Sequence, residues 1–109
     1  MKFSEIEEEY CKQVLTILKK FEYEPNNSKT RKNIETMVAD HFYDFMGSHN
    51  VNVYSNAFIC DESNNTEDII DGNGIKLTIS IQENSNSRIR NIVFDIHPQD
   101  EKHLTKTIK

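Results

Sequence analysis

The segment with the most oxygen ligands is the acidic stretch from Asp61 to Asp71, whose carboxylates and amides are of the types that calcium takes. An EF-hand loop counted from Asp61 needs Gly at its sixth position and Glu at its twelfth. The chain has Thr66 and Gly72 at those positions. We therefore expect a structural loop here, and keep a metal-dependent enzyme centred on this loop or on His41 as one hypothesis to test.

His41 is the best placed histidine for acid–base chemistry, because Asp40 and Asp44 lie within one helical turn of it. It also continues the apolar stripe of its predicted helix, which favours a half-buried structural histidine. Cys11 and Cys60 have no local signature of an activated nucleophile. The only glycine-containing turn of note, Asp71–Gly74, lacks the Lys-Ser or Lys-Thr of a phosphate loop. We expect neither catalysis nor a cofactor.

Composition limits the remaining function classes. The 109 residues fit one domain, and 13 Lys plus Arg against 18 Asp plus Glu give a net charge of −5. This balance disfavours nucleic acid as a partner, since tracking phosphates needs concentrated positive charge. No stretch approaches the roughly 20 apolar residues of a membrane span. The charged N-terminal segment does not resemble a signal peptide, so reduced thiols are expected.

Two helices are predicted in the N-terminal half. Ser4 and Glu7 form a capping-box pattern, and apolar residues then recur at helical spacing to about Phe21. A turn around Pro25 follows, and a second periodic stretch begins at Ser28 and ends near Gly47, a residue suited to a left-handed C-terminal cap. The short turn predicts an antiparallel helical hairpin.

Beyond Gly47 the period changes to that of strands. Residues 51–60 read as an irregular strand, 75–82 alternate cleanly between apolar and polar, and 91–96 form a third alternating segment. We therefore predict an α+β fold, a two-helix hairpin packed on a small three-stranded, mainly antiparallel sheet, as one domain over residues 4–97. Residues 98–109 form a polar C-terminal tail, which we expect to be disordered or ordered by a partner.

Two separated motifs of this sequence resemble the C-terminal handshake domain of contractile-phage tail sheath proteins. The first is Phe21–Asn27 followed by Thr30-Arg31, and the second is the run from Phe58 to Ile81 with its Cys-Asp, Asn-Asn-Thr and Ile-Asp elements. The resemblance covers roughly residues 10–97. The chain also resembles the small baseplate wedge proteins that start sheath assembly, a family named lysozyme-like although its members lack lysozyme activity.

The resemblance implies a virion structural protein of a contractile tail, assembled in the host cytoplasm, that nucleates or terminates sheath assembly by exchanging β-strands with neighbours. Its partners would be tail sheath, tube or baseplate subunits in a ring-forming oligomer. Because little sequence precedes the first helix, we expect the chain to accept strands through 75–82 or 89–96 and to lend its C-terminal tail. The residues assigned to strand exchange are Ile75, Leu77, Ile79, Ile81, Ile92, Phe94 and Ile96. The residues assigned to the motif loop, a structural role, are Cys60, Asp61, Asn64, Asn65, Thr66 and Asp71.

An alternative from a different class is an acidic adaptor or inhibitor that binds a single host or viral partner through its charged helix faces. This alternative predicts a monomer that forms a one-to-one complex and does not join rings. The hypothesis of a metal-dependent enzyme, by contrast, predicts tight, stoichiometric binding of a metal ion. Small sheets with spare edges are able to receive a strand from another chain, which is the physical basis for preferring assembly.

Overall fold

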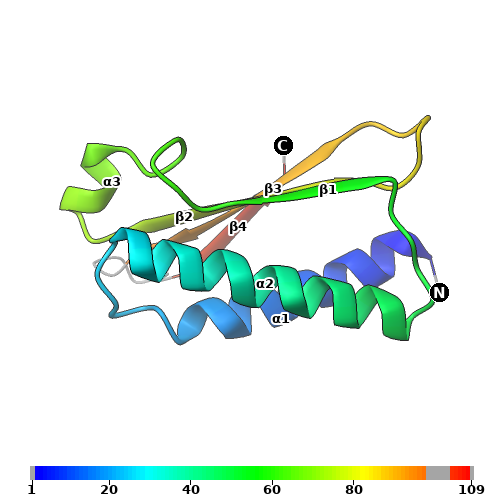
Figure 1. Cartoon of the computed structure of the whole chain (residues 1–109), viewed down its shortest axis with the longest axis horizontal. Helices are drawn as coiled ribbons and strands as arrows, with labels where there is room; N and C mark the ends of the chain where they lie inside the picture. Colours follow the sequence, from blue (N-terminus) through cyan, green and yellow to red (C-terminus); the bar gives the residue numbers. More distant parts are fainter. Residues whose placement is uncertain (1, 98–103, 109) are drawn as a thin grey trace.

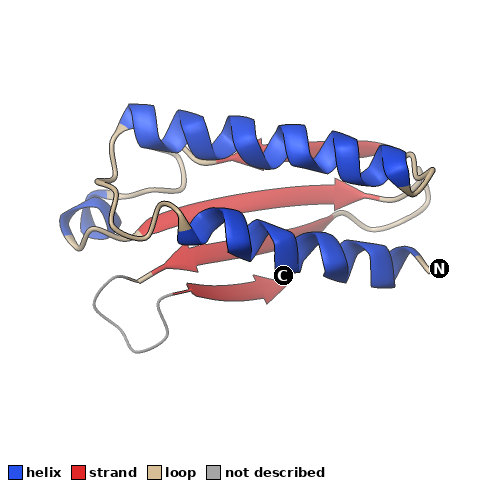
Figure 2. Ribbon diagram, turned by 90° about the horizontal axis from the view of Figure 1, so that it is seen from below, coloured by secondary structure: helices blue, strands red, loops and turns tan. Residues whose placement is uncertain are grey.

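The computed structural model describes residues 2–97 and 104–108, which form a helical layer packed on one face of a four-stranded antiparallel sheet. Figures 1 and 2 show the two long helices side by side beneath the sheet. The helices are α1 (Phe3–Lys19), α2 (Ser28–Ser48) and the short α3 (Glu67–Asp71). The strands are β1 (Ser55–Ile59), β2 (Ile75–Gln82), β3 (Arg90–Ile96) and β4 (Leu104–Ile108).

The first helix begins two residues after the start of the sequence rather than at a capping box. Its N-cap is Lys2, which makes no side-chain cap, and Ser4 lies inside the helix. Glu7, the second member of the predicted box, is buried and pairs with Arg90 of β3 instead. The capping-box prediction is therefore wrong, because the tertiary ion pair takes the carboxylate that the box needs.

The second helix begins at Ser28, the start of the predicted periodic stretch, and its N-cap is the residue before. The side chain of Asn27 accepts a hydrogen bond from the backbone N–H of Thr30, so Asn27 rather than Ser28 is the N-cap. Gly47 remains inside the helix, and the left-handed backbone conformation occurs three residues later, at Asn50 with φ of 55°. Asparagine tolerates that conformation better than most residues.

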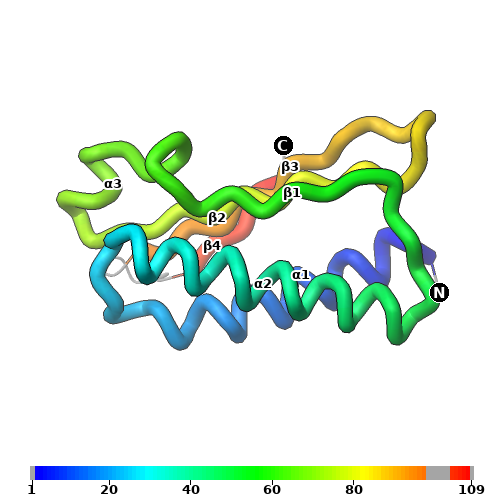
Figure 3. Tube along the Cα trace, in the orientation of Figure 1, coloured from blue at the N-terminus to red at the C-terminus, as the bar shows by residue number. Residues whose placement is uncertain are grey.

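The strands follow one another in the sheet in chain order, β1-β2-β3-β4, and every pair is antiparallel. Figure 3 shows the chain reversing direction between β1 and β2 and again between β2 and β3. The alternation predicted for residues 75–82 is confirmed, because Ile75, Leu77, Ile79 and Ile81 are all buried while the intervening residues are only half-buried. The buried face of β2 packs against α1 and α2, and neither of these two helices covers the opposite face of the sheet.

The core lies between the helical hairpin and that buried face. Tyr10, Val14 and Leu18 of α1 and Ile34, Val38 and Phe42 of α2 meet the sheet there, all at most 1% exposed. The hydroxyl of Tyr10 donates a 2.7 Å hydrogen bond to the Val38 carbonyl and so joins the two helices inside the core. The α+β class and the helical hairpin on an antiparallel sheet are confirmed.

The predicted number of strands is wrong by one. Leu104–Ile108, from the segment that the sequence analysis separated as a tail, pairs with β3 along its whole length, from Ile96↔Leu104 to Ile92↔Ile108. Only Leu104 packs against the core, and the last three residues of β4 are exposed. The remaining residues of the predicted tail, 98–103 and 109, lie outside the described part of the chain.

Candidate functional site

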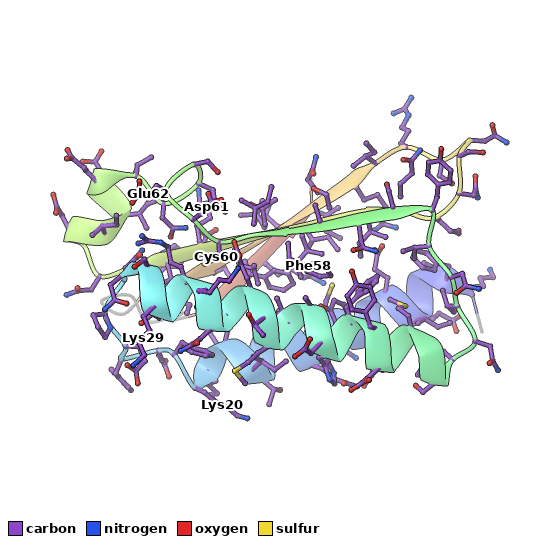
Figure 4. All side chains as sticks on the ribbon, viewed as in Figure 1. Lys20, Lys29, Phe58, Cys60, Asp61 and Glu62 are labelled. Carbon is purple, nitrogen blue, oxygen red and sulfur yellow. The ribbon has the colours of Figure 1, made fainter. Side chains whose placement is uncertain are left out.

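The loop between β1 and β2 meets the turn between α1 and α2 at one end of the molecule. Figure 4 labels Cys60, Asp61 and Glu62 of this loop, next to the N-terminal half of α2. The two sequence motifs that resemble the handshake domain are 39 residues apart at Asn26 and Asn65, and the structure brings these two side chains into direct contact. We refer to Asn26, Arg31, Asn64 and Asn65 as the asparagine junction.

Asn65 is the centre of the junction. Its side chain is 2% exposed and makes five hydrogen bonds. It accepts from the Lys76 backbone N–H at 2.8 Å and donates to the Lys76 carbonyl at 2.9 Å. A side-chain amide has the same donor and acceptor as a peptide group. The Asn65 side chain therefore pairs with the backbone of Lys76, near the start of β2, as a residue of a neighbouring strand would.

Asn26 continues the junction into the helical hairpin. Its amide nitrogen donates to the side-chain oxygen of Asn65 at 3.0 Å and to the Gly74 carbonyl at 2.7 Å. Its side-chain oxygen accepts from the guanidinium of Arg31 at 2.5 Å, and Arg31 is only 6% exposed. This chain of bonds joins the helix turn, the loop and the start of β2, and it satisfies polar groups that would be costly to bury unpaired.

Asn64 and Asp61 fold the loop on itself. Asn64 accepts from the Asp61 backbone N–H and donates to the Ile59 carbonyl at 2.8 Å, so it holds the end of β1. The Asp61 carboxylate accepts from the backbone N–H and the hydroxyl of Ser63, and these bonds lower the pKa of that carboxyl. Both are the local bonds by which such side chains hold turns.

Cys60 follows the last residue of β1 and lies against α2. Its backbone N–H donates to the Glu35 carboxylate at 2.8 Å, and its thiol is buried. Burial, and then the nearby charge of Glu35, raises the pKa of the Cys60 thiol to about 12. A shallow hollow beside it is lined by Arg31, Lys32, Glu35 and Glu62, and the Arg31 guanidinium and Glu62 carboxylate are 3.8 Å apart. At neutral pH this thiol is in its protonated, unreactive form.

Thr66 and Asp71 take a smaller part than predicted. Thr66 is the N-cap of α3 without a side-chain bond, and Asp71 is the exposed last residue of that helix. The asparagine junction therefore contains two of the six predicted motif-loop residues, Asn64 and Asn65, and Asp61 bonds to both through its backbone. Among residues 2–97 and 104–108, no three His, Cys, Asp or Glu side chains gather as a metal ion would require.

His41 contacts other elements through stacking and one hydrogen bond. Its ring stacks on Tyr10, lies 6.0 Å from the ring of Phe45, and pairs with the side chain of Gln13. Within the described part of the chain, no hydrogen bond or ion pair joins it to Asp40 or Asp44. These contacts describe the packing of a half-buried helix residue.

The residues predicted for strand exchange all face the helices. Ile75, Leu77, Ile79, Ile81, Ile92, Phe94 and Ile96 are at most 2% exposed. Their strands are internal, since β2 lies between β1 and β3, and β3 lies between β2 and β4. The two edges of the sheet belong to β1 and β4. A strand can therefore join β3 only where β4 has left it.

A second polar site lies at the other end of α1. The Glu7 carboxylate is 3% exposed and receives a 2.8 Å ion pair from Arg90 through its Oε1 atom, while its Oε2 atom has no partner. Burial raises the pKa of Glu7, and the positive charges of Arg90 and then Lys106 lower it. Lys106 is the central residue of β4, opposite Phe94. Among the buried side-chain nitrogen and oxygen atoms of the described residues, this Oε2 is the one without a hydrogen-bond partner.

Comparison with models of protein families, with curated proteins and with solved structures found no match. None of the described helices combines the length and the apolar composition needed to cross a membrane.

Three residues of the site, Asn26, Arg31 and Glu35, were not predicted from the sequence, and neither was the pair of Glu7 and Arg90. The first two lie within the motifs that carry the resemblance, so the co-occurrence of the motifs was the available signal. Nothing in the local sequence connects Glu35 to Cys60 or Glu7 to Arg90, because these contacts depend on how the helices lie over the sheet.

Proposed function

We propose that this protein is a structural subunit of a contractile tail, in which a handshake-like domain nucleates or terminates sheath assembly by exchanging β-strands with neighbouring subunits. Its partners would be sheath, tube or baseplate subunits arranged in a ring. The contractile-tail setting comes from the two motifs described above. The strand exchange is supported by the way the fourth strand is attached.

The observation that carries the proposal is the attachment of β4. This five-residue strand pairs with β3 alone, and only Leu104 packs against the core. Its departure would expose the edge of β3 without removing any of the side chains that fill the core. Sheet edges of this kind are where added strands bind, through main-chain hydrogen bonds that any extended segment can make.

The opposite edge is less suited to an added strand. Glu35 of α2 already takes the backbone N–H of Cys60 at the end of β1, and Tyr43 of α2 donates to the Asn56 side chain at 3.1 Å. The rings of Phe42, Tyr43 and Phe58 also pack together across this edge. These contacts tie β1 to α2, so we assign the exchange to the β3–β4 side.

An exchanged β4 would make the same contacts with a neighbour's β3 as it makes with its own, so concentration and geometry decide between the two. Within a ring, a neighbour held nearby has a high effective concentration. In dilute solution the intramolecular arrangement is favoured. The proposal therefore predicts a monomer that becomes an exchanged oligomer when it is placed on a sheath or tube.

The test is a pair of cysteines across the β3–β4 register. Asp95 and Thr105 are directly opposite, so Asp95→Cys with Thr105→Cys forms a disulfide within one chain in the monomer and between chains after exchange. The matched control is Thr78→Cys with Val93→Cys, opposite each other in the β2–β3 hairpin, which stays within one chain in either state. Cys11 and Cys60 are buried in both variants.

Each variant is oxidised alone and after mixing with sheath and tube subunits from the same particle. Covalent multimers in the first pair only, and only after mixing, support exchange. If both pairs remain within single chains on particles that electron microscopy shows to carry the protein, strand exchange is wrong. A protein that stays monomeric and binds one partner one-to-one would favour the adaptor alternative.

A further inference from the structure

The unpaired oxygen of Glu7 marks a position where the structure lacks a positively charged donor. A buried carboxylate is costly unless both its oxygens are paired or hydrated. Arg90 pairs with one oxygen, and the other has no partner although its side chain is 3% exposed. The second positive charge near it is Lys106, which comes from β4.

The geometry of β4 places this lysine on the helix side of the sheet. Lys106 is directly opposite Phe94, which is fully buried beneath the helices, and residues opposite each other on a sheet share a face. Leu104 and Ile108 share that face, two positions to either side. Figure 2 shows α1 running alongside β3 and β4. The strand therefore presents an apolar–x–Lys–x–apolar pattern to α1.

The ionisable groups near Glu7 come from α1, from β3 and β4, and from the residue that follows β2. Arg90 at the start of β3 and Lys106 on β4 are positive, Glu83 after β2 is negative, and Cys11 lies one turn further along α1. In the described part of the chain, Lys106 forms no ion pair with Glu7. Its side chain is exposed. An ammonium placed at the free oxygen would complete the pairing of this carboxylate.

We infer that Glu7 determines which strand can pair with the edge of β3. It selects a fourth strand with a lysine or arginine at its central, helix-facing position. In the monomer that residue is the chain's own Lys106, and after exchange it is Lys106 of a second copy. An inward-facing lysine on an edge strand normally discourages pairing. Here the buried carboxylate above it reverses that effect for strands with the right charge.

This inference rests on the proposed strand exchange, but its first test does not need exchange. Hydrogen exchange of the backbone amides of β4 is measured in the full chain for Glu7→Gln, Lys106→Gln and the double variant. We expect each single variant to speed exchange in β4 by roughly 3- to 10-fold, with the double variant no faster than the faster single one. The matched control is Lys76→Gln, which removes a lysine from the other face of the sheet, 3.9 Å from Asp95.

Additive effects in the double variant, or an equal effect of Lys76→Gln, would overturn the role of Glu7. If Glu7→Gln reduces overall folding, Lys106→Glu provides the second route, because a carboxylate facing Glu7 should speed exchange more than the glutamine does. Lys106 is exposed, so the second variant keeps the core intact.

The second test supplies the strand in trans as labelled peptides that match residues 98–109 and carry Lys, Gln or Glu at position 106. Incorporation of the Lys peptide into the full chain several-fold above the Gln peptide, with the Glu peptide weakest, supports selection by Glu7. Equal incorporation of all three overturns it. Non-additive effects of Glu7→Gln and Lys106→Gln on hydrogen exchange, without incorporation of any peptide, would support the interaction of Glu7 with Lys106 in the monomer. The same result would count against strand exchange itself.

Discussion

Replacing Asn65 should destabilise the protein more than any other single change in the β1–β2 loop. Asn65→Ala leaves the backbone N–H of Lys76 without its partner, while the Lys76 carbonyl keeps its bond from Asn64 and the Asn26 amide keeps its bond to the Gly74 carbonyl. The unpaired N–H costs about 1–3 kcal/mol, and the hydrogen bonds lost at the other two groups bring the sum to about 2–4 kcal/mol. For a domain of this size, that corresponds to a decrease in Tm of roughly 10–20 °C.

The assay is urea and thermal unfolding followed by circular dichroism, with Asn33→Ala on the exposed side of α2 as the matched control. Asn65→Asp separates shape from hydrogen bonding, because the carboxylate has the same shape but offers an acceptor where Asn65 donates to the carbonyls of Asp61 and Lys76. We expect Asn65→Asp to destabilise at least as much as Asn65→Ala. An aspartate variant as stable as the parent would refute the idea that the amide replaces a peptide group.

Two further predictions concern buried groups of the core. Tyr10→Phe removes the 2.7 Å bond to the Val38 carbonyl and should lower the free energy of unfolding by about 0.5–1.5 kcal/mol, measured by urea unfolding. Burial raises the pKa of the Cys11 thiol to about 11 and that of Cys60 to about 12, so the native state holds these protons more tightly than the unfolded chain. Stability should therefore be unaffected by these thiols below about pH 9 and fall as the pH rises above it. Cys11→Ser with Cys60→Ser should remove that decrease between about pH 9 and 10, and its persistence in that range would contradict this account. Above about pH 10 the buried Tyr10 phenol, whose pKa burial raises, adds a decrease of its own.

The elements with a complete hydrophobic period were predictable from the sequence. In α2 the apolar residues recur on one face from Ile34 to Phe45, and in β2 the alternation runs through all eight residues. These patterns are the direct result of packing one face against a core. The helical hairpin and the antiparallel sheet followed from them.

The fourth strand was missed because its pattern is weak. Leu104 and Ile108 are its only apolar residues, and two threonines and a lysine separate them. An edge strand on a sheet with one uncovered face buries little surface, so hydrophobicity carries little information about it. Its stability comes from pairing with β3, which local sequence does not reveal.

The asparagine junction was predicted only in part. Asn64 and Asn65 were assigned a turn-forming role, and the sequence rules for such side chains describe bonds to nearby backbone. The bond from Asn65 to Asn26 spans 39 residues, and the pairing with Lys76 requires β2 to lie beside the loop. Contacts of this range depend on the tertiary fold, so a single sequence does not specify them.

The meander order of the sheet has a consequence for how the protein folds. Every strand pairs with the strand next to it in the chain, and the two long helices are joined by a short turn. Proteins dominated by contacts between neighbouring segments fold faster than those that must first close long loops. The β2–β3 hairpin can form early and the remaining strands can add one at a time, so folding does not have to begin with the closure of a long loop.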